Sequence, residues 1–188
     1  MKSKIFIIEH LEPKLWPWCI IEYKHISRTV RKKNVWFTNI KKSDVRKLEK
    51  YGKVFTQSIK SMRLENPYLL DPEAKQTLTP ENSRPFQYFI FGGILGDNPP
   101  KKRTQAELAL FLPNAKIFNI GKAQMSTDNA VYVVKQIVNG TPLEKIPFQD
   151  EIEIKLNKIE STILPYRYAL VNGKPFYSKE LINYLKKN

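Results

Sequence analysis

The chain of 188 residues carries 32 Lys and Arg against 18 Asp and Glu, which gives a formal net charge of +14. Its 41% hydrophobic and 12% aromatic residues are typical of a globular protein and exclude a disordered polycation. One cysteine excludes a disulfide framework, and with only two histidines we expect no metal site. No stretch approaches the roughly 20 apolar residues of a membrane helix. We therefore expect a cytoplasmic protein with no membrane partner.

The positive charge is concentrated in the first third of the chain. Residues 1–60 contain 15 basic and 5 acidic side chains, a net charge of +10. Such a field attracts phosphate-rich partners and favours an RNA or ribosomal partner. The alternative is a lysine-rich surface that contacts only water.

The first third predicts alternating strands and helices. Short runs of β-branched and aromatic residues predict strands, and apolar residues at three- and four-residue steps predict helices. These patterns place strands at residues 4–9, 34–38 and 54–55, and helices at residues 15–33 and 43–51, with Gly52 as the C-cap of the second helix.

The remaining sequence continues this order and then changes. Strands are expected at residues 69–70, 86–91 and 116–120, with helices from a capping box at Thr104–Glu107 to Phe111 and from Ser126 to Gly140. Fully apolar strands between helices predict an α/β fold whose sheet is covered on both faces. After residue 147, segments 148–156, 163–171 and 178–187 predict a C-terminal extension. We thus divide the chain into a domain at 1–147 and an extension at 148–188.

A glycine-rich loop follows the most apolar strand. Three glycines within five residues allow positive φ angles and close approach of the backbone to a ligand. Loops that leave the carboxyl ends of parallel strands are where α/β proteins bind ligands. The loop matches neither a dinucleotide fingerprint nor a P-loop. A tight turn without a ligand is the weaker alternative for this loop, which reads Gly92, Gly93, Ile94, Leu95, Gly96, Asp97, Asn98, Pro99 and Pro100.

Two further loops also follow predicted strands. Residues 119–128 end in Ser126 and Thr127 at a helix start, where free N–H groups and hydroxyls hold an anion or an adenine edge. Ordinary N-capping explains the same residues. Leu70-Asp71-Pro72 alone indicates only the end of a strand. Three such loops together are what a buried nucleoside pocket needs.

Residues 88–100, followed by Arg103-Thr104, resemble a family of SPOUT-type methyltransferases that depend on S-adenosylmethionine (SAM). This family includes a fungal protein-arginine methyltransferase that acts on a ribosomal protein. Residues 124–130 are similar to its second signature, although Ser126 stands where the family has Thr, and residues 7–10 and 69–72 also match.

The resemblance implies a parallel sheet with a C-terminal trefoil knot, here from about residue 68 to 140. It also implies that SAM is the cofactor and binds among three loops. Carried over by position, the cofactor-binding residues are Leu70, Asp71, Pro72, Gly92, Gly93, Leu95, Gly96, Ile120, Gly121, Gln124, Met125, Ser126 and Thr127.

Methyl transfer to arginine requires a carboxylate, because the guanidinium is protonated at pH 7 and must lose a proton. Asp97, on the cofactor loop, is the first candidate for this catalytic role, and Glu9, at a strand end, is the second. A side chain that only stabilises its own turn is the alternative for Asp97. Asn98 and Arg103 are candidate substrate-binding residues, although a surface role explains Arg103 equally well.

We therefore expect a SAM-dependent methyltransferase of the translation machinery. Its substrate is expected to be an arginine of a ribosomal protein or a structural RNA. The alternative is a non-enzymatic protein that binds RNA or the ribosome on a degenerate SPOUT scaffold. A homodimer is typical of SPOUT enzymes, and a monomer is the other option.

Overall fold

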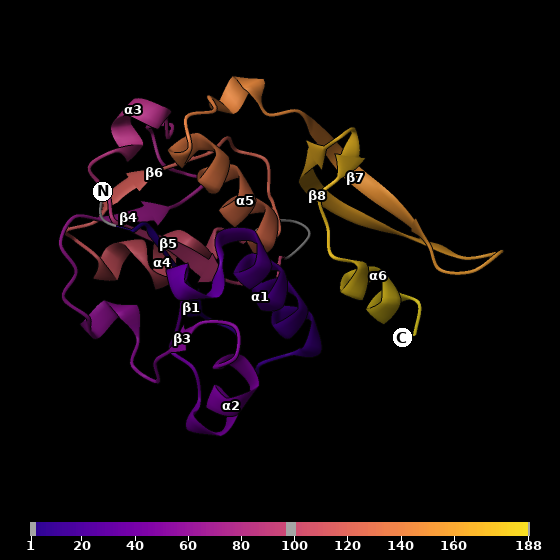
Figure 1. The fold of residues 1–188 in the computed structure, drawn as a ribbon, viewed down its shortest axis with the longest axis horizontal. Helices are drawn as coiled ribbons and strands as arrows, with labels where there is room; N and C mark the ends of the chain where they lie inside the picture. Colours follow the sequence, from indigo (N-terminus) through magenta and orange to yellow (C-terminus); the bar gives the residue numbers. More distant parts are fainter. Residues whose placement is uncertain (1–2, 97–100, 188) are drawn as a thin grey trace.

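The computed structural model describes residues 3–96 and 101–187. Six parallel strands form one sheet in the order β3-β2-β1-β5-β4-β6 (Figure 1). The strands are β1 (Ile5–His10), β2 (Val35–Thr38), β3 (Lys53–Val54), β4 (Pro67–Leu70), β5 (Tyr88–Gly93) and β6 (Lys116–Phe118). The predicted α/β fold with a parallel sheet is confirmed.

The two central strands, β1 and β5, position the glycine-rich loop. All six residues of β1 are buried, as expected for a parallel strand covered on both faces. β5 runs two residues beyond the predicted end at Phe91, because Gly92 pairs with Glu9 and Gly93 with His10. The loop therefore begins at the carboxyl edge of the sheet, level with the end of β1.

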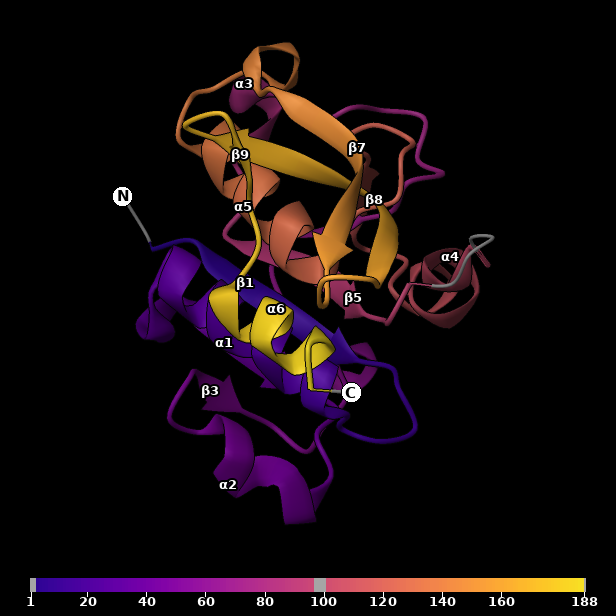
Figure 2. The same ribbon diagram turned by 90° about the vertical axis from the view of Figure 1, so that its right-hand side faces the viewer.

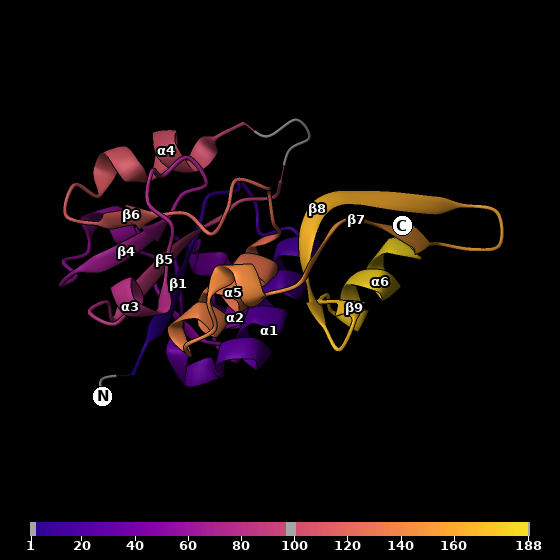
Figure 3. The same ribbon diagram turned by 90° about the horizontal axis from the view of Figure 1, so that it is seen from above.

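Helices cover both faces of the sheet (Figure 3). α1 (Pro17–Val30) and α5 (Thr127–Val138) lie on one face together with α3 (Pro80–Ser83), and α4 (Arg103–Glu107) lies on the other. α1 buries Cys19, Tyr23, Ile26 and Val30, which recur at helical spacing against the sheet. It is shorter than the predicted 15–33 because the chain turns at Arg31, whose φ is 69°.

Two predicted caps were wrong. Thr104 does not cap α4; the helix begins at Arg103, after Lys102 in a left-handed conformation. Gly52 is not a C-cap with positive φ either. A Cβ at Gly52 would lie 2.8 Å from the Val35 carbonyl oxygen, so close packing against β2 requires the glycine. The predicted helix at 43–51 is a 3-10 turn at Lys42–Asp44 followed by the short α2 (Val45–Leu48).

The C-terminal extension begins at Phe148 and forms a separate antiparallel sheet. It contains β7 (Phe148–Lys155), β8 (Ser161–Val171), β9 (Lys174–Pro175) and α6 (Lys179–Leu185). The β7–β8 hairpin projects from the molecule, and α6 lies along α1 (Figures 1 and 2). Ile152, Leu164 and Leu181 pack with Trp18 and Ile21 of α1. The extension is thus attached through this cluster and through Ala169, which is buried in the main core.

Within residues 3–96 and 101–187, no helix has the length and apolar character needed to cross a membrane. The trefoil knot and the oligomeric state stay predictions.

Aromatic packing on the sheet face covered by α1 and α5 should contribute most to the free energy of unfolding. Phe89 is fully buried, and its ring centroid lies 5.2 Å from that of Tyr68 and 5.7 Å from that of Phe6. Phe89→Ala should lower the free energy of unfolding by about 3–5 kcal/mol through lost burial and a cavity. Phe111→Ala, at a 52% exposed phenylalanine, should cost under about 1 kcal/mol. Urea unfolding measures both, and equal losses would contradict this assignment of the core.

Candidate active site

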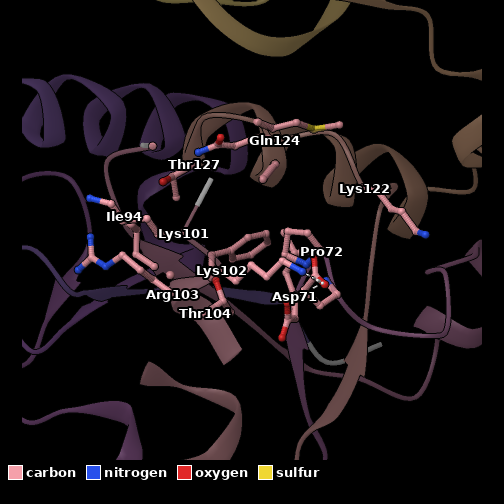
Figure 4. Close-up of a pocket in the computed structure, with 17 residues that line it drawn as sticks. Asp71, Pro72, Ile94, Lys101, Lys102, Arg103, Thr104, Lys122, Gln124 and Thr127 are labelled. Atoms are coloured by element: carbon pink, nitrogen blue, oxygen red, sulfur yellow. Dashed lines mark hydrogen bonds and ion pairs between the residues drawn. The ribbon is translucent and has the colours of Figure 1, made fainter. Parts of the chain in front are cut away.

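A cavity of about 370 Å³ lies at the carboxyl edge of the sheet, beside β4 and β5 (Figure 4). Its walls come from four segments: residues 70–73 after β4, residues 91–96 at the end of β5, residues 101–104 at α4, and residues 122–130 before and within α5. The cavity therefore lies where ligands bind in parallel α/β sheets.

The structure brings together many of the predicted site residues. Those that line the cavity are Leu70, Asp71, Pro72, Gly92, Gly96, Arg103, Gln124, Met125 and Thr127. Five others belong to the same loops without lining it: Gly93, Leu95, Ile120, Gly121 and Ser126. Asp97 and Asn98 lie outside the described residues. Glu9 is placed away from the cavity.

The first wall is a turn built by Asp71. The Asp71 backbone N–H donates to the Phe118 carbonyl over 3.1 Å, which ties the turn to β6. Its carboxylate accepts the backbone N–H of Glu73 over 3.0 Å. These two hydrogen bonds thus hold the turn in place, and Leu70 and Pro72 line the cavity.

The glycines of the second wall permit two close approaches. A Cβ at Gly93 would lie 2.3 Å from the Tyr23 hydroxyl, so this glycine lets α1 pack against the end of β5 rather than contact a ligand. A Cβ at Gly96 would lie 2.6 Å from both Gln124 and the Tyr166 ring. Gly96 therefore lets its loop pack closely against Gln124, in the wall formed by residues 122–130, and against Tyr166 of the extension.

The extension holds two walls of the cavity in place. The Tyr166 hydroxyl donates to the Gly96 carbonyl over 2.9 Å, and the Arg167 N–H donates to the Gln124 carbonyl over 2.8 Å. Further along, buried Asn129 of α5 accepts from the Ala169 N–H and donates to the Phe176 carbonyl. Residues beyond 147 are thus part of the site's framework, a role that the sequence pattern did not predict.

Arg103 lines the cavity, but its guanidinium is engaged by carboxylates of the protein. Its Nη1 lies 2.7 Å from Glu12, and its Nε lies 2.7 Å from Glu107. Glu12 also accepts the Leu95 N–H over 3.1 Å, so the pair fixes the glycine-rich loop. These carboxylates raise the pKa of Arg103. Sequence reasoning missed Glu12, although its position just after β1 was a usable signal.

Glu9 joins strands rather than facing the cavity. Its carboxylate accepts hydrogen bonds from the Thr38 hydroxyl (2.5 Å), the Ser58 hydroxyl (2.5 Å) and the Ile59 N–H (3.0 Å). The side chain is fully buried. These bonds connect β1, β2 and the segment that follows β3.

The cations on the cavity rim do not come from the basic first third of the chain. They are Lys101, Lys102, Arg103 and Lys122. Lys102 also forms a 2.8 Å ion pair with Glu73, which links two walls (Figure 4). The concentrated charge of residues 1–60 therefore does not supply the cations that line this cavity.

A cluster of buried ionisable groups lies behind Thr127. Glu22 of α1 accepts the Trp18 indole N–H over 2.8 Å. Burial, together with the neighbouring charge of Asp128, raises the pKa of Glu22 to about 8. Asp128 lies 2.6 Å from His25 Nδ1. The sequence pattern indicated only a cap at Asp128, because tertiary contact alone joins it to Glu22.

Ser126 is the N-cap residue of α5, as predicted, but its hydroxyl does not cap the helix. It donates instead to Asp128 over 2.6 Å. The side chain thus orients the acidic cluster.

The raised pKa of Glu22 predicts a pH-dependent contribution to stability. The folded protein holds this proton more tightly than the unfolded chain does. The contribution is therefore complete below the ordinary pKa of 4.5 and is lost as pH rises to about 8. In urea unfolding across this range, wild type should lose unfolding free energy relative to Glu22→Gln, whose side chain stays neutral at every pH. A constant difference would contradict the assignment.

The Tyr166 hydroxyl should support ligand binding through the Gly96 loop. Tyr166→Phe removes one hydrogen bond, worth about 0.5–1.5 kcal/mol. It should weaken binding of SAM, the cofactor that the sequence resemblance implies, by about 2- to 10-fold in calorimetry. Tyr177→Phe removes the same atom from the same extension, away from this cavity, and should leave the affinity unchanged. Equal affinities of the two variants would contradict this role of the extension.

Comparison with known proteins agrees with this geometry. Residues 5–188 match the family model described as protein arginine N-methyltransferase SFM1-like. Protein arginine N-methyltransferase SFM1 of Saccharomyces cerevisiae is 36% identical over 202 residues, which cover 97% of this chain and 94% of the relative.

Solved structures give the same result. The yeast arginine methyltransferase SFM1 complexed with SAM superposes with a TM-score of 0.89 at 36% identity, covering 100% of this chain and 91% of that one. Its complex with SAH has a TM-score of 0.88 at 34% identity, covering 97% and 94%. A dual-specific Trm10 from Thermococcus kodakaraensis, at 16% identity and a TM-score of 0.64 over 76% and 96%, shares the fold. The predicted methyltransferase class is confirmed, and the chain belongs to the SFM1-like family of protein arginine N-methyltransferases.

Proposed function

We propose that this chain transfers a methyl group from SAM to an arginine of a protein, and that the protein belongs to the ribosome. The observation that carries the proposal is the cavity formed by the same three loops that the sequence resemblance assigns to the cofactor. The relative that covers 97% of this chain is named a protein arginine N-methyltransferase.

The cavity fits an adenosyl group in size and in lining. Its volume of about 370 Å³ is within the range of roughly 300–1,000 Å³ typical of small-molecule sites. Leu70, Phe91, Met125 and Ala130 offer apolar contacts for a base, and the loop backbone and Gln124 offer polar ones. When bound, SAM supplies an electrophilic methyl group on a positively charged sulfur.

The predicted cofactor residues divide into two roles. We assign direct contact to those that line the cavity. Gly93, Leu95, Ile120, Gly121 and Ser126 act by shaping its loops. Leu95, for example, is held by Glu12 through its backbone N–H.

The predicted catalytic and substrate residues are assigned as follows. Asp97 remains our candidate for holding the substrate guanidinium, because it follows Gly96 on the cavity wall, and Asn98 adjoins it. Glu9 takes a structural role, because it does not line the cavity and its carboxylate joins β1, β2 and the segment after β3. Arg103 positions the loop through Glu12 instead of binding substrate.

An RNA substrate is the second candidate, favoured by the net charge of +10 over residues 1–60. Such a basic surface would also be attracted to a substrate protein that is surrounded by ribosomal RNA. The charge therefore supports a ribosomal setting without selecting the methylated molecule.

Methylation with labelled SAM tests the proposal. The purified chain should label an arginine in ribosomal protein and leave total RNA unlabelled. Gly96→Ala should lower labelling, because its Cβ would meet Gln124 and Tyr166 at 2.6 Å and force these side chains to shift. Label in RNA alone would reject the protein substrate. Absence of both labelling and calorimetric SAM binding would favour the non-enzymatic scaffold.

A further inference from the structure

Methylation of arginine requires a proton acceptor, a requirement that rests on the proposed function. A guanidinium nitrogen forms the new bond to the methyl carbon. The carbon–sulfur bond breaks with its electron pair left on sulfur, and one N–H proton departs. Two positive charges enter the reaction, and methylguanidinium and the released proton carry them afterwards. The proton needs a base near the cavity.

The described carboxylates around the cavity differ in whether a cation of the protein already pairs with them, and therefore in how readily they accept a proton. Glu73 is paired with Lys102, and Glu12 is paired with Arg103 and bonded to the loop. Asp71 holds its own turn through the Glu73 N–H. Within residues 3–96 and 101–187, Glu22 has no ion pair with a lysine or arginine, and it lies directly behind the cavity wall.

Thr127 connects Glu22 to the cavity. Its side chain lines the cavity, and its hydroxyl and backbone N–H both hydrogen-bond to the Glu22 carboxylate. Glu22 itself is 5% exposed. A proton that leaves a group beside Thr127 thus reaches a buried carboxylate through one hydroxyl.

The same cluster continues along α1 from Glu22 to His25, three residues further on. Asp128 neighbours Glu22, and its Oδ2 lies 2.6 Å from His25 Nδ1. His25 lines a second cavity of about 640 Å³, together with Arg28, Lys135 and Phe176. Imidazole is the side chain that exchanges protons with water near neutral pH. The second cavity therefore offers an exit to solvent.

We propose that Glu22 is the proton acceptor of the methyl transfer, reached through Thr127, and that Asp128 and His25 return the proton to solvent. Glu22 passes from carboxylate to carboxylic acid as the guanidinium N–H bond breaks. The proton then moves through Asp128 to His25 and leaves at the second cavity. The chain of groups works as a relay only while Glu22 begins each turnover ionised.

The surroundings of Glu22 set the pH range of this relay. Asp128 faces it from α5, Tyr168 from β8, and Cys19, Tyr23 and His25 share or adjoin its helix face. Burial and these acidic neighbours disfavour its charge, whereas Trp18 and Thr127 favour it. A base whose pKa lies near the working pH is the most effective one.

Steady-state kinetics between pH 6 and pH 9 test the relay, and Glu144→Gln, an exposed carboxylate on a distant turn, is the control. Wild-type kcat should rise with pH and level off above about 8. Glu22→Gln should lower kcat by about 100-fold and remove that rise, while the KM for SAM changes by less than about threefold. Glu22→Asp should restore the rise, and His25→Gln should lower kcat by about 10-fold. The control should match wild type.

Infrared difference spectroscopy gives a readout that does not depend on turnover. A protonated carboxyl band should titrate near pH 8 in wild type and in Glu144→Gln, and should be missing from Glu22→Gln. Either a wild-type pH profile in an active Glu22→Gln or a band that survives this substitution would overturn the inference. A wild-type chain that methylates no protein would instead defeat the proposed function, and the band would still report on Glu22.

Discussion

The site depends on close packing of three backbone segments at Gly96. A Cβ at this glycine would lie 2.6 Å from both the Gln124 side chain and the Tyr166 ring, so an added methyl group would have to displace them. Because Tyr166 and the backbone of Arg167 also hydrogen-bond to both loops, β8 sets their separation. The cavity walls are therefore positioned by a strand more than 40 residues away in sequence.

Charged side chains occupy two different environments near the cavity. Around the cavity, exposed or half-buried cations are paired with carboxylates, as in Lys102–Glu73 and Arg103–Glu12, so they connect walls. Behind Thr127, Glu22 and Asp128 are buried close to each other and Asp128 is paired with His25, so the proton affinity of Glu22 is high. The first arrangement holds the loops, and the second is suited to moving a proton.

The sequence predicted the elements that depend on local pattern. The apolar run in β5, the helical spacing in α1 and the loops after parallel strands follow from such patterns, since periodicity and burial arise from neighbouring residues. The individual lining residues came from the family resemblance instead. The caps at Gly52 and Thr104 were misassigned because a glycine that permits close packing, or a threonine inside a helix turn, has the same sequence pattern as a cap.

The sequence by itself determined the parallel α/β fold, the three loops that line the cavity and, through resemblance, the methyltransferase class. Only the tertiary structure decided that Arg103 is held by Glu12, that Glu9 joins strands, that Tyr166 bonds to the Gly96 carbonyl and that Glu22 neighbours Asp128. Each of these contacts joins residues of different elements, and 91 positions separate Arg103 from Glu12 while 70 separate Tyr166 from Gly96. Local pattern carries no information on such pairs. They form only when the chain folds and segments distant in sequence meet at the carboxyl edge of the sheet.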